Sequence, residues 1–464
     1  MSYPGPWSRC VAAGILLATL LAAGCVHAPQ NAPLNGAPAH AYRLTPRQPA
    51  KERQDLLLAV FFSGGGSRAA ALSYGVLKTL HEARIGAATG ETSLLEQVDA
   101  ISAVSGGAIT AAYYCLFGDE LFHGFERTVL THNIERDLIL RALRPDNLYR
   151  LASPYYGRSD LAATYYDQEI FRRKTFGDLA QLPNRPFLII NATDMSTGAR
   201  VGFTQASFDV IGSDLSAFPI GRAVAASTAV PLLLTPVTLH NYAANSPREQ
   251  LGSRSSEAAL SERFARMIED LNSYRESPDR RYVHLVDGGV ADNLGIRAMQ
   301  EFTMLNGGLV SSLQRLNLSR VTKVAVIVVD ASVRFDGAWD KREATPGTLG
   351  VMKAISQSVL SRGNYETTDL FRRSMELWQQ QLREERHRTA DGGELPELGF
   401  YFIRLDFAAA DPEERKFFYN VRTDLSLSRA AAGKIIAAAG TLLRENAEYQ
   451  RLLHDLSSET ARSL

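Results

Sequence analysis

The stretch LLLAVFFSGGGSRAA (residues 56–70) places three consecutive glycines almost directly after an apolar run. A short, fully apolar run is typical of a strand buried on both faces of a sheet. The glycines leave the backbone bare, and two functions compete for them: a phosphate cradle, or amides directed at an oxyanion. Gly64, Gly66 and Ala69 fit the G-x-G-x-x-G/A pattern of dinucleotide-binding folds, so this stretch alone does not separate the two.

Similar apolar runs alternate with helical segments along the chain, as at 70–83. The runs lie at 98–104, 186–193, 282–286, 321–329 and 399–405. This alternation predicts an α/β fold with a mostly parallel sheet sandwiched by helices. A last helix is expected at about 428–453. Residues 243–280, which are polar and lack a strong apolar face, are expected to form a surface insertion near the mouth of the site.

The composition limits the class of protein. The 464 residues are 45% hydrophobic and carry a formal charge of zero, which suits a sizeable globular core and points to no nucleic-acid partner. Neither an H-E-x-x-H motif nor a calcium loop occurs, so we expect no metal and no cofactor. The oligomeric state is left open.

The N-terminus resembles a bacterial lipoprotein signal peptide over residues 1–24. Its apolar segment, 11–23, is shorter than the roughly 20 residues of a membrane span. The sequence LAAGC ends at Cys25 and resembles a lipobox, with Ala22 where leucine is commoner. The resemblance implies a lipidated Cys25; the alternative is an ordinary secretory signal with an incidental cysteine. Val26, rather than aspartate, favours the outer membrane, with the domain facing the periplasm or the surface.

Two expectations follow for the mature chain. Residues 25–52 are rich in proline and alanine and predict a tether, so the globular domain should occupy 53–464 with a C-terminal extension. Cleavage would remove Cys10 and lipidation would use Cys25, which leaves Cys115 alone. In its apolar helical context we interpret Cys115 as a small core residue and not as a nucleophile.

The stretch ISAVSGGAIT (residues 101–110) takes a strand into a helix with no loop between them. Such a corner approximates the nucleophile elbow G-x-S-x-G, in which small residues two before and two after the serine let strand and helix approach. Ala103 and Gly107 meet that need, so Ser105 is the candidate nucleophile. Ser102 is the competitor, but it lies inside the strand. The alternative for this corner is a simple turn with a capping serine.

A third feature is YVHLVDGGVADNLGI (residues 282–296), in which a strand ends at Asp287 before two glycines. Carboxyl ends of strands are where open α/β sheets place their ligands. The alternative is a turn aspartate that caps backbone amides. Asp292 and Asn293 are interpreted as caps of the next helix.

These features decide the function of the glycines. A dinucleotide site wants an acid at the end of the second strand, where this chain has Ser105, and a Walker A loop wants lysine before Ser/Thr. Oxyanion binding is favoured because the chain also offers a nucleophile and an acid.

Together, G-G-G-x-R, the elbow serine and D-G-G in this order resemble the patatin-like phospholipase family. FGDL (176–179), NATDMSTG (191–198) and AVAASTAVPLLLTPV (223–237) match as well, and the resemblance runs from about Leu56 to Gln300. The family usually has glycine where this chain has Ala69 and Ala103. The resemblance implies a three-layer α/β/α fold.

The resemblance also implies a mechanism: a Ser105–Asp287 dyad that cleaves lipid esters without histidine, with Gly64, Gly65 and Gly66 as oxyanion hole. Arg68 is expected to orient the glycine loop or to meet lipid phosphate, the alternative being a solvated first-turn arginine. The implied partners are a phospholipid or related lipid ester and, through Cys25, a membrane.

Two rival functions remain. A Ser–His–Asp esterase would need a histidine, but His387 and His454 lie in charged helical segments and His284 lies inside a strand. The other rival is a non-catalytic lipid-binding or envelope-scaffold lipoprotein.

Overall fold

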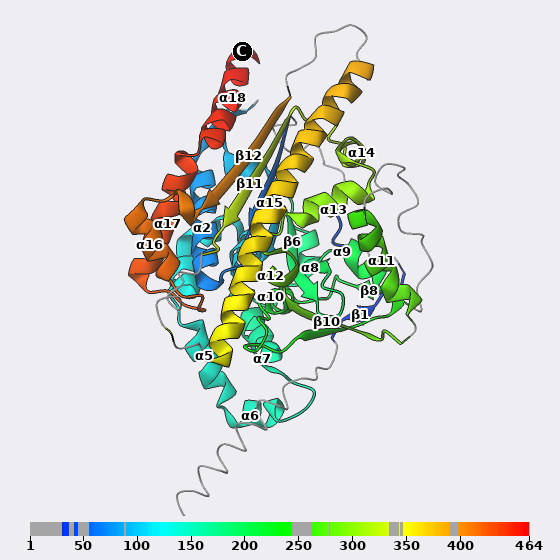
Figure 1. Cartoon of the computed structure of the whole chain (residues 1–464), viewed down its shortest axis with the longest axis vertical. Helices are drawn as coiled ribbons and strands as arrows, with labels where there is room; N and C mark the ends of the chain where they lie inside the picture. The colour runs from blue at the N-terminus through cyan, green and yellow to red at the C-terminus, as the bar shows by residue number, and fades with distance from the viewer. Residues whose placement is uncertain are drawn as a thin grey trace, which may run out of the picture.

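The computed structural model describes residues 30–36, 41–44, 55–87, 90–243, 262–277, 279–333, 343, 347–389 and 398–463. Their centre is an eight-stranded mixed sheet of order β12-β11-β2-β5-β6-β10-β9, with β7 paired to β6 (Figure 1). The strands are β2 (Leu56–Phe62), β5 (Val98–Val104), β6 (Phe187–Asp194), β7 (Arg200–Gly202), β9 (Val237–His240), β10 (Tyr282–Asp287), β11 (Lys323–Asp330) and β12 (Gly399–Asp406).

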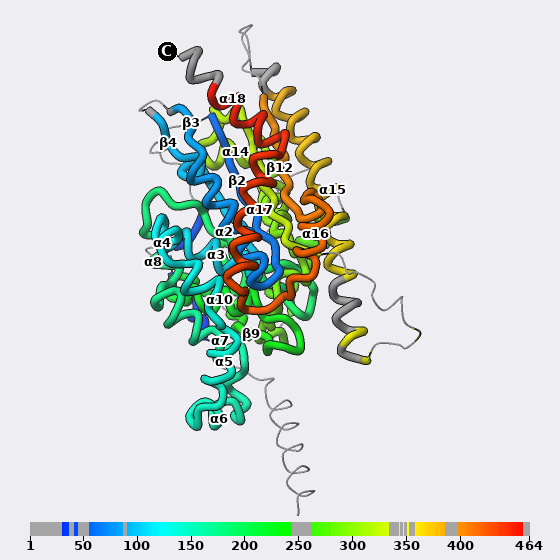
Figure 2. Tube along the Cα trace, turned by 90° about the vertical axis from the view of Figure 1, so that its left-hand side faces the viewer, coloured from blue at the N-terminus to red at the C-terminus, as the bar shows by residue number. Residues whose placement is uncertain are grey.

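Helices cover both faces of this sheet. One layer contains α2 (Gly66–Glu82), α3 (Ser105–Phe117), α16 (Pro412–Asn420), α17 (Arg429–Arg444) and α18 (Ala447–Ser463), and Figure 2 looks onto it. The other contains α9 (Gln205–Val210), α11 (Glu262–Glu276), α12 (Gly289–Asp292), α13 (Arg297–Leu305), α14 (Leu309–Arg315) and α15 (Thr348–Thr389). Leu58 and Val60 of β2 face the first layer, whereas Ala59 and Phe61 face the second. The predicted three-layer α/β/α fold is confirmed.

Shorter elements complete the fold. The remaining helices are α4 (Leu121–Phe125), α5 (Ile134–Ala142), α6 (Pro145–Leu151), α7 (Arg158–Tyr165), α8 (Phe176–Ala180) and α10 (Ile220–Ser227). Two small ribbons pair β1 (Ala32–Pro33) with β8 (Ser213–Asp214) and β3 (Arg84–Ala87) with β4 (Gly90–Ser93). Cys115 is fully buried in α3, as expected of a core residue, and burial raises the pKa of its thiol to about 12.

The direction of β10 differs from what the sequence argument assumed. The argument for Asp287 used the carboxyl edge of a parallel sheet, but β10 runs antiparallel to β6. Asp287 pairs with Ala192 while Val104, at the end of β5, pairs with Asn191. The two strands therefore reach the same level of the sheet from opposite directions, and Asp287 still arrives beside the end of β5.

The expected tether is wrong for its described parts. Asn31 is buried, and its side chain donates to the hydroxyl of Ser213 over 3.0 Å. Tyr42 is 5% exposed, stacks on Phe187 and accepts a 2.7 Å hydrogen bond on its hydroxyl from the amide of Leu188. The stacked ring of Tyr42 and the pairing of β1 with β8 hold this segment against the domain, although its sequence has no periodic pattern of apolar residues.

The expected last helix is two helices. The chain leaves the helix after Arg444 and begins α18 at Ala447. Asn446 causes the break because its side-chain oxygen accepts from the amides of Glu448 and Tyr449, both at 3.1 Å, which is the bonding of an N-cap. The apolar stripe continues across this joint, so periodicity alone did not reveal it.

The polar insertion is only partly described, since residues 244–261 and 278 lie outside the described chain. Its described helix, α11, does present an apolar stripe. Phe264 and Tyr274 are buried, and Met267 and Leu271 line a cavity on the second helical layer. The helix covers that face of the sheet, and the lack of an apolar face was a wrong expectation.

Candidate active site

Ser105 occupies a sharp corner between β5 and α3. Its φ is 51°, in the left-handed region that non-glycine residues adopt only at a cost of about 1–3 kcal/mol. The residue after it must be glycine, because a Cβ on Gly106 would overlap the carbonyl oxygen of Gly66. A Cβ on Gly107 would lie 2.7 Å from the carbonyl oxygen of Ser63. The corner is thus a strained elbow packed against the glycine loop.

Asp287 lies beside this elbow. Ser105 is 6% exposed and Asp287 8%. The Ser105 hydroxyl is close enough to the carboxylate to lower its pKa, and the Gly289 amide donates to Oδ1 over 2.7 Å. Burial outweighs both contacts and raises the pKa of Asp287 to about 6. A carboxylate with that pKa is a better base near neutral pH than an exposed aspartate.

The glycine loop reaches the same corner, and it offers two free amides where three were predicted. Gly64 packs close to Ser105, since a Cβ there would lie 3.4 Å from that of Ser105. Its amide, however, donates to the carbonyl of Asn293 over 3.0 Å and is used structurally. The amides of Gly65 and Gly66 have no backbone acceptor within the described chain. These two residues have φ values of 140° and 62°, which glycine adopts without strain.

Arg68 is placed behind the loop. It is 2% exposed, which excludes the solvated arginine and leaves no path to a lipid phosphate. Its Nε donates to the carbonyl of Ala331 over 2.9 Å and its Nη1 to that of Val421 over 2.6 Å. Burial lowers its pKa to about 10, so the guanidinium stays charged at neutral pH. Arg68 ties the start of α2 to the end of β11 and to the segment after α16.

Two residues that sequence reasoning did not single out hold the elbow. The hydroxyl of Ser227, at the end of α10, accepts from the Ser105 amide over 2.8 Å and donates to the Asn191 carbonyl over 2.6 Å. The carbonyl of Ala229, two residues on, accepts from the Asp287 amide over 2.9 Å. The end of α10 therefore fixes both site residues. Both Ser227 and Asn191 lie in sequence blocks that matched the family pattern, which was the available signal.

The two polar residues after Asp287 behave differently from each other. Asp292 Oδ2 accepts from the amide of Arg297 over 2.7 Å at the start of α13, which confirms its capping role. Asn293 is buried beside the glycine loop, where its side-chain oxygen would lie 2.6 Å from a Cβ on Gly64. The expectation that Asn293 caps the next helix is wrong: Asn293 ends α12, and its carbonyl accepts from the Gly64 amide of the loop.

The histidines lie elsewhere. Nδ1 of His284 is 3.0 Å from the hydroxyl of Thr238 on the neighbouring strand. His454 is exposed on α18, and the side chain of His387 lies outside the described residues. Within the described chain, no histidine hydrogen-bonds to Ser105 or Asp287, and no group of three or more His, Cys, Asp and Glu is disposed to hold a metal ion. None of the described helices has the length and apolar character to span a membrane.

A family model described as patatin-like phospholipase matches residues 60–299, about half of the chain. Human GIVD cytosolic phospholipase A2 has a similar structure, with a TM-score of 0.50, 12% identity and coverage of 97% of this chain and 67% of that one. VipD from Legionella pneumophila gives a TM-score of 0.27 at 11% identity, covering 89% and 71%. No curated protein sequence matches the chain. At 12% identity the likeness to the human enzyme concerns the fold alone.

Proposed function

Because the chain belongs to the patatin-like phospholipase family, we propose that it is a serine acyl hydrolase that cleaves ester bonds of phospholipids or related lipids, a phospholipase A-type activity. Ser105 is the nucleophile and Asp287 the base, and the amides of Gly65 and Gly66 receive the oxyanion. The observation that carries the proposal is the strained Ser105 elbow facing a buried carboxylate.

The steps follow from this geometry. The Ser105 oxygen attacks the ester carbonyl while its proton passes to Asp287, and the negative tetrahedral oxygen turns toward the glycine amides. The protonated Asp287 then gives its proton to the leaving alcohol as the acyl-serine forms. Asp287 next accepts a proton from water as the water oxygen attacks the acyl group. It then returns this proton to the Ser105 oxygen as the acyl–oxygen bond breaks, which releases the fatty acid and free Ser105.

The segment that follows Ala229 supports a lipid substrate. Directly after Ala229, the chain exposes Val230 (43%), Leu232 (58%) and Leu233 (63%). Leu232 has a φ of 75°, which is strained for a leucine. Exposed apolar side chains that follow so closely on a contact with Asp287 favour an apolar acyl chain as the substrate's partner for this segment.

The test is fatty-acid release from mixed phospholipid vesicles by the full chain, with Ser105→Ala and Asp287→Asn alongside. Ser428→Ala, a serine that caps α17 far along the chain, is the matched control. We expect hydrolysis by the parent and the control and loss in both site variants. Activity that survives Asp287→Asn would contradict the dyad and return attention to a histidine. Absence of hydrolysis, together with no labelling of Ser105 by a fluorophosphonate, would favour the non-catalytic scaffold.

We also propose that Cys25 carries an acyl anchor and that the enzyme is an outer-membrane lipoprotein facing the periplasm or the surface. Cys25 lies outside the described residues, and the support is the lipobox-like sequence. Only four residues separate it from Gln30, whose side chain accepts a 3.0 Å hydrogen bond from Arg222 of α10. The anchor would therefore hold the domain close to the membrane. Labelling of the parent, but not of Cys25→Ser, by an alkyne fatty acid in bacteria is the expected result.

A further inference from the structure

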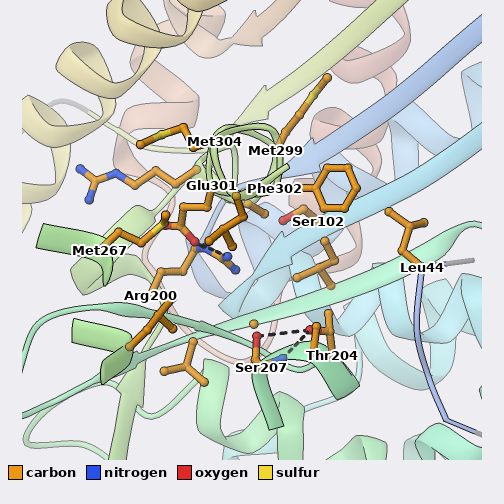
Figure 3. Close-up of a pocket in the computed structure, with 18 of the residues that line it drawn as sticks. Leu44, Ser102, Arg200, Thr204, Ser207, Met267, Met299, Glu301, Phe302 and Met304 are labelled. Carbon is orange, nitrogen blue, oxygen red and sulfur yellow. Dashed lines mark hydrogen bonds and ion pairs between the residues drawn. The ribbon is translucent and has the colours of Figure 1, made fainter. Parts of the chain in front are cut away.

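A cavity of about 690 Å³ opens on the second helical layer. Its floor is the face of the sheet that carries Leu57, Ala59 and Phe61, and its walls include residues of α9, α11, α13 and α14 (Figure 3). Neither Ser105 nor Asp287 lines it. We refer to this space as the sheet-face cavity.

The walls of the sheet-face cavity are mostly apolar. Protein interiors normally pack as densely as organic crystals, so a space of this size marks a place where packing is given up. Water is held poorly by apolar walls because it needs several polar partners. Met267, Met299 and Met304 line the space (Figure 3), and their flexible thioether chains adapt to ligands of varied shape. Size and lining both fall within the range of small-molecule sites.

One end of the cavity carries more positive than negative charge. Arg200 pairs with Glu301, and Arg266 lies 3.6 Å from Asp270, so these two guanidinium groups have carboxylate partners. Arg263 and Arg297 also line the cavity, and among the described residues neither has a carboxylate within 4.0 Å.

These two arginines are half-buried, and Arg263 reaches Gln300, which lies one turn from Arg297 on α13. Burial and the neighbouring charge of Arg297 lower the pKa of Arg263. Arg263 donates to the neutral Gln300 over 2.8 Å. Nη2 of Arg297 donates to the neutral hydroxyl of Thr367 over 3.4 Å, and its Nε is buried with no hydrogen-bond partner. The carboxylates of Glu301 and Asp292 also act on Arg263, from beyond 4.0 Å. Set against the three guanidinium groups of Arg200, Arg263 and Arg297, these two carboxylates leave an excess of one positive charge.

We infer that the sheet-face cavity binds a single-chain anionic lipid, with its alkyl chain along the sheet and its anionic group between Arg263 and Arg297. A long-chain fatty acid has this chemistry, as does a lysophospholipid with an anionic phosphate. The alkyl chain would fill the space that the methionines and the strand residues leave. The anion would supply the negatively charged partner that both guanidinium groups lack. The site goes beyond the proposed hydrolysis, because Ser105 takes no part in it.

The test is fluorescence titration of the chain carrying Cys25→Ser, which removes the proposed acyl anchor, with an anthroyloxy-labelled stearic acid. The titration is repeated with Ser105→Ala. We expect saturable binding with one site and the same affinity in both chains. Unlabelled oleate and lysophosphatidic acid are compared as competitors, which separates a carboxylate from a phosphate source. Absence of saturable binding in both chains would overturn the inference, whereas its persistence without any hydrolysis would leave the inference standing and the proposed function refuted.

Charge variants locate the anionic group. Arg263→Gln and Arg297→Gln should each weaken binding about ten-fold, the effect of losing one hydrogen bond to a charged group. Arg266→Gln is the matched control, since Arg266 lies on the same helix and lines the same cavity but already has Asp270 as partner. The methyl ester of the labelled acid should bind equally to all four chains. Equal loss in Arg266→Gln and Arg263→Gln would place the anion elsewhere and overturn the assignment.

A filling variant locates the alkyl chain. Ala100 lies on β5 and lines the cavity, so Ala100→Phe places a ring in the space. We expect loss of saturable binding of both the acid and its methyl ester while hydrolysis by Ser105 persists. Unchanged binding in Ala100→Phe would show that the lipid lies elsewhere, for example at the dyad. The arginine variants decide the matter should this variant fail to fold.

Discussion

The Ser105 corner and the sheet-face cavity lie on one sheet and are packed in opposite ways. At the corner, backbones approach so closely that Gly106 has no room for a methyl group, and the Ser105 amide and the Asp287 carboxylate each have a hydrogen-bond partner. In the cavity, methionines and strand residues leave about 690 Å³ unfilled, and Arg297 keeps a buried nitrogen without a partner. The difference indicates two kinds of binding: a rigid site shaped for a transition state, and an adaptable one shaped for a chain.

The two regions share a border. Arg200 lines the cavity and donates to Oδ1 of Asn191 over 2.7 Å. The carbonyl of Asn191 accepts from Ser227, whose hydroxyl oxygen accepts from the Ser105 amide. The Ser105 corner therefore depends on residues that also line the sheet-face cavity. Substitutions at the corner and in the cavity test whether the two regions act independently.

The largest effect is expected for Asp287→Asn. Loss of a general base should lower hydrolysis about 10²–10⁴-fold. The same substitution should raise the folding stability of the chain at neutral and alkaline pH. The pKa of Asp287 is about 6 in the folded chain against an ordinary value of 3.8, so burying the charge costs about 3 kcal/mol above pH 6. This cost disappears as the pH falls through 6 toward 4, because the folded state then binds the proton first.

The variant should therefore be more stable than the parent at pH 8 and equal to it at pH 4. Denaturant unfolding at the two pH values measures both differences. A variant that is less stable than the parent at pH 8 would show that Asp287 supports the fold and is not held there at a cost to stability.

Sequence reasoning found most of the rigid corner because its constraints are local. A strand that ends in a serine followed by two glycines has few alternatives to the elbow, and the register between β5 and β6 then fixes its level. The role of Asn293 could not be found this way, because it uses the amide of Gly64 through contact between segments that are far apart in the chain. The pattern of apolar residues also does not predict the direction of β10, because a buried strand has the same pattern whether it pairs parallel or antiparallel with its neighbour.

The sequence did not predict the sheet-face cavity, for a related reason. The stripe Phe264, Met267, Leu271 and Tyr274 on α11 was present in the sequence, but charged neighbours concealed it. A cavity forms where side chains from several segments fail to fill the space between them, so no single segment predicts it. The buried Tyr42 shows the same limit, because its partners Phe187 and Leu188 lie far along the chain.

The next largest effect is expected for Gly106→Ala. The added methyl group would overlap the Gly66 carbonyl, so the glycine loop must shift. Overpacking of this kind costs about 1–3 kcal/mol of stability, and misplacement by about 1 Å lowers rates about 100-fold. Thermal unfolding and vesicle hydrolysis measure the two effects.

Gly433→Ala is the matched control, because Gly433 lies in helix α17 and a Cβ there meets nothing within 4 Å. That variant should be as stable as the parent or slightly more stable, since alanine favours the helix. If both glycine variants behave alike, the close approach at the corner is not what holds the site.

A smaller effect on hydrolysis by the parent chain is expected when the pH is lowered from 7.5 to 5. With a pKa of about 6, Asp287 is mostly ionised at pH 7.5 and mostly protonated at pH 5, where it no longer accepts the serine proton. The rate kcat/KM should therefore fall about ten-fold for each pH unit below about 6. Return of a sample from pH 5 to pH 7.5 controls for unfolding. A rate that stays level from pH 7.5 to pH 5 would show that a group with a much lower pKa is the base.

The smallest effect is expected for Ala100→Phe, and it separates the two kinds of packing most directly. Its ring enters the sheet-face cavity, so the free energy of unfolding should stay the same or rise by about 1 kcal/mol, as other cavity-filling changes do. Ala325→Phe, on β11 of the same sheet, adds the same ring at a fully buried alanine in the dense core and should cost about 1–3 kcal/mol or more. Denaturant unfolding of the two variants compares them. Equal losses would mean that the cavity collapses in solution, whereas a loss confined to Ala325→Phe would leave one sheet with a rigid corner and a space kept open beside it.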